Sequence, residues 1–537
     1  MGRGGPGRRV AARPITELQL REDTGSRRRP AVLLPPSVPE RRRLRDDRAA
    51  LLVGALVVAW AALFSWLSVA RYRGFSTGRF DLGNMVQAVW STADGRFLDT
   101  TDISGVQFNR LGAHVDPVLA LFAPLWMVWS SPEMLLVAQA VIVSLGALPA
   151  FWLGRRWLGD DRLAVAGAVL YLMAPGLMHA TLFDFHPVTL AAPLLLFCIW
   201  AAEEARWVTL AVCATLAVLC QEQVGLLIAA LAVWLWFRHP SRRLAAVVLA
   251  TGALAWVVIA FAVILPSFAL KGVNPHLGRY SSLGDGPGEI LLTFVTRPWE
   301  AAEIVLTPGR LGYVLGLLAA TLFLALAAPV LAAVALPQLV INLFASTGPA
   351  QTVEYHYAVL LVPVLVAASL LGLAILRARN LPGRLGRLLG DSGRMAAAMV
   401  GATLLLGVFL GPLPLWGWIP GGWGSAPMHA FSVDAQARAL QEAVDRVPEG
   451  VPVSATNDAG AHLSARRRIH LFPKLKDAQY VLYADGERSR AMARDRPTLR
   501  PLGTAVKLRQ LLRSREWTLI FEKEGVRLYR SVPRSRS

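Results

Sequence analysis

Long apolar runs separated by short polar segments dominate the chain. Leu51–Ala70, Met134–Leu153 and Leu244–Leu265 are each long enough to cross a ~30 Å hydrocarbon core as a helix. Lipid offers the backbone no hydrogen-bond partners, so such runs are expected to be helical. The pattern predicts an all-α polytopic membrane bundle of about eleven transmembrane helices. They are placed near 51–70, 133–154, 161–178, 187–202, 206–221, 223–237, 243–266, 309–328, 329–346, 355–376 and 394–415.

The segments that flank these runs divide the chain into regions. Residues 1–48 are rich in Arg, Pro and Gly, which predicts a disordered basic cytoplasmic tail. This tail is too long for a signal peptide, so the first helix is expected to be retained. Residues 49–418 form the predicted transmembrane domain, with a first outer loop at 71–132. In this loop Pro117–Ser130 is short and Trp-rich, which favours a segment lying in the membrane interface.

The pattern changes after Trp418, and residues 428–537 are typical of a small α/β domain. Val451–Thr456 and Tyr480–Ala484 are predicted strands, and a Glu-Gly turn joins a predicted hairpin. Eleven spans and a cytoplasmic start place this domain outside the cytoplasm. Asn457-Asp458 follows the first strand and is read as a turn, and the arginines at 466–468 are read as a solvated charge run. The predicted helices are Asp434–Val447 and Thr504–Ser514, and the hairpin strands are Trp517–Phe521 and Val526–Tyr529.

Composition supports a membrane protein, because 54% of residues are apolar and only 17% are charged. The net charge of +19 comes mainly from arginine, a bias typical of GC-rich bacterial genomes. The arginines lack interleaved aromatic residues, which argues against nucleic-acid binding. Their loops instead indicate orientation in a bacterial inner membrane, with the N-terminus in the cytoplasm. The predicted cytoplasmic loops hold Arg155, Arg156, Arg162, Arg206, Arg238, Arg242, Arg243, Arg377, Arg379, Arg384, Arg387 and Arg394.

Ionisable residues gather in the segments predicted to face outward. Such residues are costly beside apolar segments, which makes them candidates for function. Asp81 is read either as an N-cap or as a general base for a hydroxyl group. His114-Val-Asp116-Pro and Asp184-Phe-His186-Pro are near mirror images. Their Asp/His pairs could cap helices, orient an imidazole, bind phosphate or ligate a cation.

The remaining candidates have similar alternatives. Glu222 is either an exposed hairpin tip or a partnered functional carboxylate. Glu354 and His356 are candidates for substrate binding, although their flanking tyrosines also fit an interfacial aromatic belt. The loop 266–300 is either a solvated loop or a grip for a phosphate. Its basic residues are Lys271, His276, Arg279 and Arg297.

No cofactor motif accompanies these residues. Cys198, Cys213 and Cys220 lie in apolar segments without metal-ligand spacing, which predicts a packing role. The sequence contains no P-loop, dinucleotide fingerprint or nucleophile elbow.

Several of these motifs together resemble a known family. Phe80-Asp81-Leu-Gly-Asn84, the two Asp/His motifs and Gln221-Glu222 are similar to those of predicted bacterial membrane proteins catalogued as domain of unknown function two thousand and seventy-nine. That family resembles the GT-C glycosyltransferases, which include protein mannosyltransferases and aminoarabinose transferases. Asp81 matches the position of their catalytic acidic residue, and Asp116 falls at their second loop motif. The paired Asp-Glu of the aminoarabinose enzymes is absent, which leaves Asp81 and Asp116 as alternative bases.

The resemblance implies transfer of a sugar from a polyprenyl-phosphate donor to an extracytoplasmic acceptor. In that chemistry Asp81 or Asp116 deprotonates the acceptor, and the phosphate leaves with inversion at the anomeric carbon. The leaving phosphate needs charge stabilisation, for which Lys271, Arg279, Arg297 or His356 are candidates. The same mechanism is compatible with a divalent cation held by Asp116, His186 and Glu222 but does not require one. Two other readings remain open from the residues alone. One is a membrane transporter, and the other is a non-catalytic cell-envelope protein whose C-terminal domain binds a partner.

Overall fold

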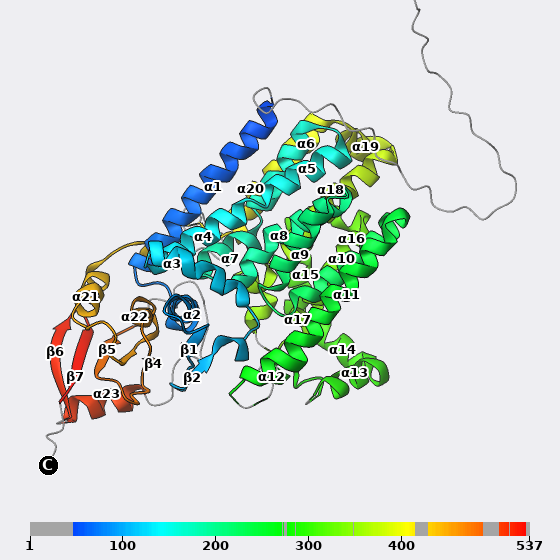
Figure 1. The fold of residues 1–537 in the computed structure, drawn as a ribbon. Coiled ribbons are helices and arrows are strands. Elements are labelled where there is room, and N and C mark those ends of the chain that lie inside the picture. Colours follow the sequence, from blue (N-terminus) through cyan, green and yellow to red (C-terminus); the bar gives the residue numbers. More distant parts are fainter. Residues whose placement is uncertain are drawn as a thin grey trace, which may run out of the picture. The chain divides into compact units, whose positions relative to one another are not determined.

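The computed structural model describes residues 47–270, 272, 277–284, 286–346, 348–413, 428–486, 504–514 and 516–532. Helices make up most of this part of the chain and pack side by side, and a small sheet lies at one end of them (Figure 1). The tail predicted for residues 1–48 lies outside the described residues, except for Asp47 and Arg48.

The bundle helices follow the predicted apolar runs, and polar residues define several of their ends. The carboxylate of Asp47 accepts a hydrogen bond from Ala50 N at the start of the first helix. Proline occupies the first position of several others, where its missing N–H costs nothing. The helices are α1 (Arg48–Arg73), α4 (Pro132–Ser144), α5 (Ala147–Leu158), α6 (Asp161–Leu172), α7 (Pro175–Phe183), α8 (Pro187–Glu203), α9 (Trp207–Val218), α10 (Val224–Arg238), α11 (Arg243–Ile259), α12 (Leu265–Phe268), α15 (Pro308–Ala320), α16 (Pro329–Ala332), α17 (Leu336–Phe344), α18 (Leu361–Ala378), α19 (Gly383–Gly390) and α20 (Ser392–Leu410).

Only some of these helices have the length of a membrane span. Among the described residues, four helices are long and apolar enough to cross a membrane, or up to six if each of two bent pairs is one span. The apolar run 309–328 is interrupted after α15, where Leu322 and Phe323 adopt positive φ angles. The run 329–346 is likewise divided between α16 and α17. The count of eleven spans therefore stays a prediction.

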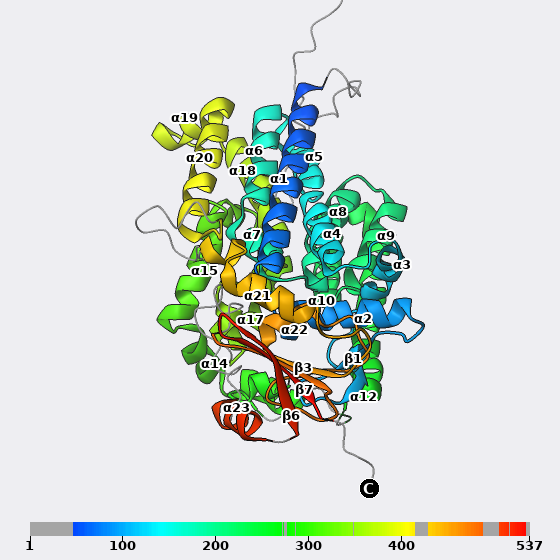
Figure 2. The same ribbon diagram turned by 90° about the vertical axis from the view of Figure 1, so that its left-hand side faces the viewer.

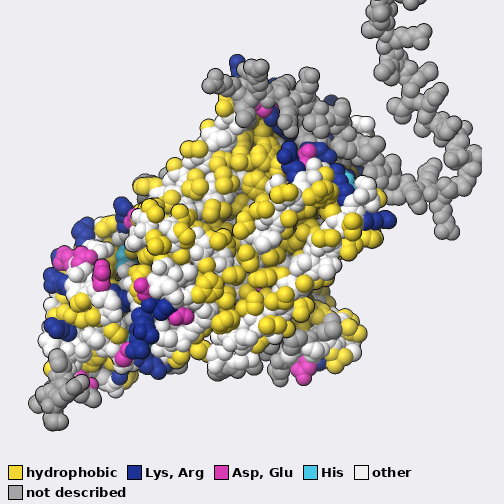
Figure 3. Space-filling model, in the orientation of Figure 1, with side chains coloured by type: hydrophobic (Ala, Val, Ile, Leu, Met, Phe, Trp, Pro, Cys, Tyr) yellow, Lys and Arg dark blue, Asp and Glu magenta, His cyan; other side chains and the backbone are white. Residues whose placement is uncertain are grey.

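Exposed apolar side chains cover much of the bundle surface, and charged side chains gather toward its ends (Figure 3). The segment Pro117–Ser130, predicted to lie in the interface, contains a turn of 3₁₀ helix followed by α3 (Ala123–Val128). Met127 and Val128 are 72% and 88% exposed there. A surface of this kind is stable next to lipid and unfavourable in water.

A buried carboxylate joins three elements at the end of the bundle that is remote from the sheet. Glu203, the last residue of α8, is fully buried. Its oxygens lie 3.1 Å from Arg156 Nε of α5 and 3.0 Å from Arg238 Nε of α10, and His239 Nε2 lies 3.2 Å away. We call this end the basic end, because the arginines predicted to face the cytoplasm lie there. The three cysteines are free, and Cys198 and Cys220 are buried, as expected for packing residues.

The C-terminal part of the chain forms a five-stranded sheet in the order β4-β3-β5-β7-β6. Strand β3 pairs in parallel with β4 and β5, whereas β7 is antiparallel to both β5 and β6. The predicted hairpin and the two predicted helices are confirmed. The elements are α21 (Ala435–Val444), β3 (Val453–Ala455), α22 (Asn457–His462), β4 (Ile469–Leu471), β5 (Tyr480–Ala484), α23 (Thr504–Arg513), β6 (Trp517–Lys523) and β7 (Val526–Ser531).

The segment between β3 and β4 differs from its prediction. Asn457 and Asp458, read as a turn, begin α22. Arg466, read as part of a solvated charge run, is 6% exposed and donates to the carbonyl oxygens of Leu463 and Val451 at 2.6 and 2.9 Å. Both features depend on tertiary contacts of this segment, which local sequence does not reveal. Figure 2 shows α22 next to α2 (Asn84–Ala93) of that loop.

Candidate functional site

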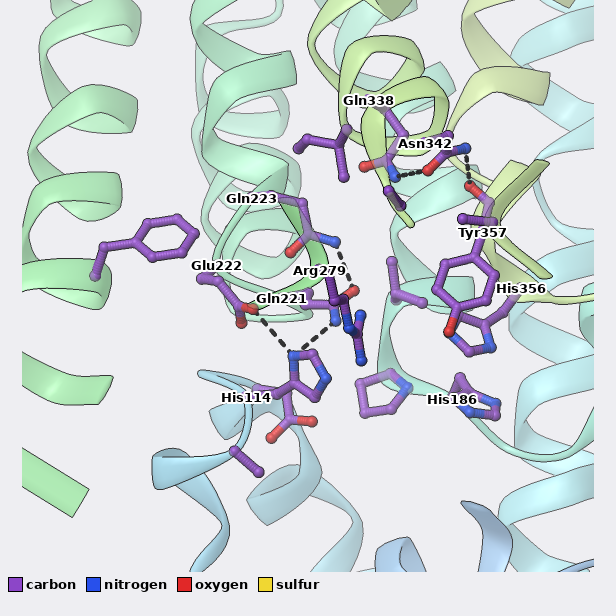
Figure 4. Close-up of a pocket in the computed structure, with 18 of the residues that line it drawn as sticks. His114, His186, Gln221, Glu222, Gln223, Arg279, Gln338, Asn342, His356 and Tyr357 are labelled. Carbon is purple, nitrogen blue, oxygen red and sulfur yellow. Dashed lines mark hydrogen bonds and ion pairs between the residues drawn. The ribbon is translucent and has the colours of Figure 1, made fainter. Parts of the chain in front are cut away.

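A cavity of about 1110 Å³ lies where the first loop meets the ends of several bundle helices. Its lining comes from four parts of the chain: the first loop with its hairpin β1 (Asp99–Thr101) and β2 (Gln107–Asn109), the start of α8, the α9–α10 hairpin, and residues 261–360. The last part includes α13 (Pro287–Thr296), which precedes α14 (Pro298–Val305). Polar side chains of these segments converge on one space (Figure 4). The sequence-predicted residues that line it are Asp81, His114, Asp116, His186, Glu222, Arg279 and His356.

Asp81 belongs to a short turn held through its backbone. Residues Arg79–Gly83 form a single π-helical turn, and we call Gly78–Gly83 the Asp81 turn. The N–H groups of Gly78 and Leu82 donate to Asp184 Oδ2 at 3.0 and 3.4 Å. The Phe80 N–H donates to Asn457 Oδ1 at 2.9 Å. Side chains distant in sequence therefore hold the turn, and the Asp81 carboxylate lines the cavity.

His186 stands beside this carboxylate. Its Nε2 lies 3.4 Å from Asp81 Oδ1, and its Nδ1 lies 3.3 Å from the carbonyl oxygen of Asp184. The His186 ring stacks on His356 with centroids 3.9 Å apart. Its backbone N–H donates to Gln139 Oε1 at 2.9 Å. The backbone and the ring of His186 are thus both fixed, which orients Nε2 toward Asp81.

Asp184 supports the turn and does not itself line the cavity. It is 3% exposed, and its Oδ1 lies 3.6 Å from Arg71 Nη1. Burial raises the pKa of this carboxyl, and the positive charge of Arg71 opposes that rise. Arg71 also donates to the backbone carbonyls of Leu182, Phe183 and Ser76. Asp184, predicted to bind substrate, lies outside the cavity lining and contacts the backbone of the Asp81 turn.

Asp116 is almost completely buried in the cavity wall, and one of its two carboxylate oxygens contacts Arg110. Arg110 Nε and Nη2 lie 3.0 and 2.7 Å from Asp116 Oδ2, and Arg110 Nη1 donates to Asn84 Oδ1 at 3.2 Å. Burial raises the pKa of Asp116, while Arg110 and His114 act in the opposite direction. The carboxylate is 1% exposed, so access to it from the cavity is narrow.

Glu222 connects the first loop to the α9–α10 hairpin. His114 Nδ1 lies 3.0 Å from Glu222 Oε1, and the N–H of Val115 donates to Oε2 at 2.9 Å. Gln221 Nε2 also lies 3.0 Å from His114 Nδ1 (Figure 4). Glu222 is 3% exposed, so it is a partnered carboxylate and not the exposed hairpin tip that was the alternative reading.

The two described basic candidates of the loop 266–300, Arg279 and Arg297, lie in different places in the structure. Arg279 lines the cavity and reaches between the His114 side and the His186–His356 side (Figure 4). Within the described part of the chain its guanidinium forms no ion pair. Arg297 is exposed, pairs with Glu300 at 3.2 Å and lies away from the cavity lining. Glu354 is half-buried outside the lining, and Lys271 and His276 lie outside the described residues.

The candidate metal ligands do not form one cluster. Among the described residues, no three His, Cys, Asp or Glu side chains come together as a metal site. Asp116 faces Arg110, Glu222 faces His114, and His186 faces Asp81. Each candidate therefore has a different partner.

Some cavity residues were missed by sequence reasoning. Gln338 and Asn342 line the cavity from α17, where Gln338 Nε2 donates to Asn342 Oδ1 at 2.8 Å (Figure 4). Two amides spaced i and i+4 in an apolar run are a detectable signal, because both lie on one helix face. Arg110 precedes Asp116 by six residues and could have been paired with it. Outside the lining, Asn457 was read only as a turn and Gln139 was not singled out, because their partners Phe80 and His186 are distant in sequence.

Comparison with known proteins identifies the family. Residues 71–519 match the family described as "Predicted membrane protein (DUF2079)". The chain belongs to this family. This confirms the membership expected from the Asp81, Asp/His and Gln-Glu motifs. A search of curated proteins gives no match.

Two solved structures are similar to this chain. Both are ArnT from Cupriavidus metallidurans, one bound to undecaprenyl phosphate and one in the apo state. The lipid-bound structure has 13% sequence identity and a TM-score of 0.47, and the alignment covers 90% of this chain and 99% of that chain. The apo structure has 14% identity and a TM-score of 0.48, with coverage of 90% and 98%.

Proposed function

We propose that this DUF2079 protein is a membrane glycosyltransferase that moves a sugar from a polyprenyl-phosphate donor to an extracytoplasmic acceptor. One observation carries the proposal: a single large cavity combines the Asp81–His186 pair, the guanidinium of Arg279 and apolar walls. A carboxylate beside an imidazole is suited to proton removal, and a guanidinium is suited to a phosphate. The motif resemblance to GT-C enzymes implies the same chemistry.

The apolar part of the cavity suits the lipid part of such a donor. Phe261, Leu270, Ile290, Phe294 and Val340 contribute to its lining. An isoprenoid chain gains free energy by leaving water for a surface of this kind. Arg279 lies in the same cavity, where its positive charge can pair with the phosphate group of the donor. A transporter would need polar residues along a path through the bundle, whereas these polar residues gather at one end.

The proposed reaction uses Asp81 as the general base. The acceptor hydroxyl gives its proton to the Asp81 carboxylate as its oxygen attacks the anomeric carbon. The bond from that carbon to the phosphate oxygen breaks, and polyprenyl phosphate leaves with its electron pair. Arg279 stabilises the charge that develops on this leaving group. The products are the inverted glycoside and the lipid phosphate.

His186 is placed to accept the proton from Asp81. With its Nδ1 facing the carbonyl oxygen of Asp184, a neutral His186 carries its proton on Nδ1 and presents Nε2 as an acceptor. Nε2 lies 3.4 Å from Asp81, so it can receive the proton that Asp81 removes. We assign the base to Asp81 in preference to Asp116, because Arg110 already occupies Asp116 Oδ2.

The test is transfer from radiolabelled polyprenyl-phosphate sugars by the purified protein, followed by release of polyprenyl phosphate. We expect Asp81→Asn to lower transfer by about a hundredfold or more, because an amide cannot accept the proton. Asp94→Asn is the control, since that carboxylate is 53% exposed and pairs with Arg96. Equal transfer by Asp81→Asn and wild type would remove Asp81 from the mechanism. Substrate uptake into sealed vesicles without release of lipid phosphate would support the transporter instead.

A further inference from the structure

We propose that the C-terminal sheet region positions the Asp81 carboxylate, acting through Asn457 of α22. This inference rests on the proposed function and extends it to a part of the chain that contributes nothing to the cavity wall. Among the described residues, the cavity lining ends at Leu360. Asn457 is therefore a positioning residue, which acts on substrate only through Asp81.

The first contact is a hydrogen bond to the backbone next to Asp81. Asn457 is 5% exposed, and its Oδ1 accepts from the Phe80 N–H at 2.9 Å. Asp184 accepts from Gly78 and Leu82 N–H on the same turn. Two side chains, one from the bundle and one from the sheet region, thus accept from three amides of one short turn. A buried amide that loses its acceptor is costly, so both contacts define the turn's conformation.

Close backbone packing couples α22 to the Asp81 turn. A Cβ atom added to Gly83 would lie 2.4 Å from Ser464 Oγ, and one added to Gly460 would lie 2.6 Å from Arg79 Cβ. Both distances are below van der Waals contact, so only glycine allows this approach. A shift of α22 must therefore displace the turn as well.

Further contacts anchor α22 to the bundle side. The His462 ring lies between Tyr72 and Phe75, with centroids 4.0 and 3.7 Å away, and its Nε2 donates to the Tyr72 carbonyl at 2.9 Å. Gln87 Nε2 of α2 donates to the Arg466 carbonyl at 2.9 Å. The buried guanidinium of Arg79 donates to the carbonyl oxygens of Thr101 and Ile469. These contacts fix Asn457 relative to the end of α1, which precedes the Asp81 turn by a few residues.

The first test is independent of activity. Hydrogen–deuterium exchange of the intact protein in detergent reports protection of the Phe80 amide. We expect Asn457→Ala to speed exchange in peptides spanning residues 76–84 by about tenfold, because the Phe80 N–H loses its acceptor. Asn457→Asp keeps an acceptor oxygen and should restore protection. Gln441→Ala, on the exposed face of α21, is the matched amide control. Unchanged exchange in Asn457→Ala overturns the proposal.

The second test measures transfer kinetics with the donors used for Asp81→Asn. We expect Asn457→Ala to lower kcat by about ten- to a hundredfold with KM unchanged, since a displaced base slows proton transfer without altering the donor cavity. Loss of donor binding, seen as a raised KM with kcat retained, contradicts a positioning role. If the wild type itself transfers no sugar, the proposed function fails, and the exchange measurement still decides whether Asn457 holds the turn.

Discussion

At the residue scale, the carboxylates of Asp81, Asp184 and Asp116 have different surroundings and therefore differ in their ability to act as a base. Asp81 faces His186 within the cavity, whereas Asp184 is buried behind it and accepts from the backbone of the Asp81 turn. Asp116 is held by the guanidinium of Arg110. Only a carboxylate that a hydroxyl group can reach can act as a base. The environment therefore separates residues that look alike in the sequence.

His462 provides a pH-dependent prediction at this scale. Enclosure of the ring lowers the pKa of His462 from 6.5 to about 3, although its hydrogen bond to Tyr72 opposes the shift. Between these values the unfolded chain binds a proton and the folded chain does not, so stability falls as pH falls. We expect the melting temperature of the wild type to drop from about pH 7.5 to about pH 5.

His462→Phe isolates this contribution, because phenylalanine keeps a ring between Tyr72 and Phe75 but does not titrate. Its melting temperature should be lower at neutral pH, since the bond to the Tyr72 carbonyl is lost, and should depend less on pH than that of the wild type. Intrinsic tryptophan fluorescence during heating in detergent gives the measurement. Parallel pH dependence in the two proteins would show that His462 is not protected from protonation.

At the scale of elements, helix ends are joined by ionic contacts that close the basic end. Glu203 at the end of α8 faces Arg156 of α5 and Arg238 of α10. Among the described residues its neighbour Glu204 pairs with Arg156 alone, at 2.8 Å, and is 29% exposed. The two adjacent glutamates therefore form a matched pair that differs in burial and in the number of partners.

We expect Glu203→Ala to lower the free energy of unfolding by about 3 kcal/mol, because two arginines lose a buried partner. Glu204→Ala should cost less than about 1 kcal/mol, as for a partly exposed pair. Thermal unfolding of both variants in the same detergent measures the difference. Equal melting temperatures would mean that the Glu203 contacts contribute little to holding α5, α8 and α10 together.

Sequence reasoning succeeded for elements whose pattern is local. The long apolar run 51–70 is contained in α1, and alternation around the Glu-Gly turn predicted the β6–β7 hairpin. Sequence reasoning failed where tertiary packing determines the local structure. It missed the three-residue strand β4 and the break after α15. Three residues of the Asp/His motifs line one cavity, and they were noticed because polar residues stand out between apolar runs. The contact of Asn457 could not be predicted, since its partner Phe80 is distant in sequence.

At the scale of the whole molecule, the orientation in the membrane is a proposal that labelling can test. Polar cavity residues lie at one end of the bundle, and the arginines of the basic end lie at the other. The positive-inside rule places the basic end in the cytoplasm. The cavity is then open to the outer side, where a lipid-linked donor and an extracytoplasmic acceptor would meet.

Single cysteines on a background without Cys198, Cys213 and Cys220 test this orientation. Ser104→Cys lies in the exposed first loop, and Ser241→Cys lies at the exposed basic end. We expect a membrane-impermeant maleimide to label Ser104→Cys in intact cells and Ser241→Cys only in inverted vesicles. Labelling of both positions from the same side contradicts the proposed orientation.

The hydrogen bond between Phe80 and Asn457 joins residues 377 positions apart, which has a consequence for biogenesis. A ribosome finishes the first helix and the Asp81 segment long before it reaches the codon for Asn457. The Phe80 amide must therefore wait for most of the polypeptide to be synthesised before it meets its acceptor. A chain released between Leu360 and Asn457 would carry all the described cavity-lining residues and still lack the finished geometry around Asp81.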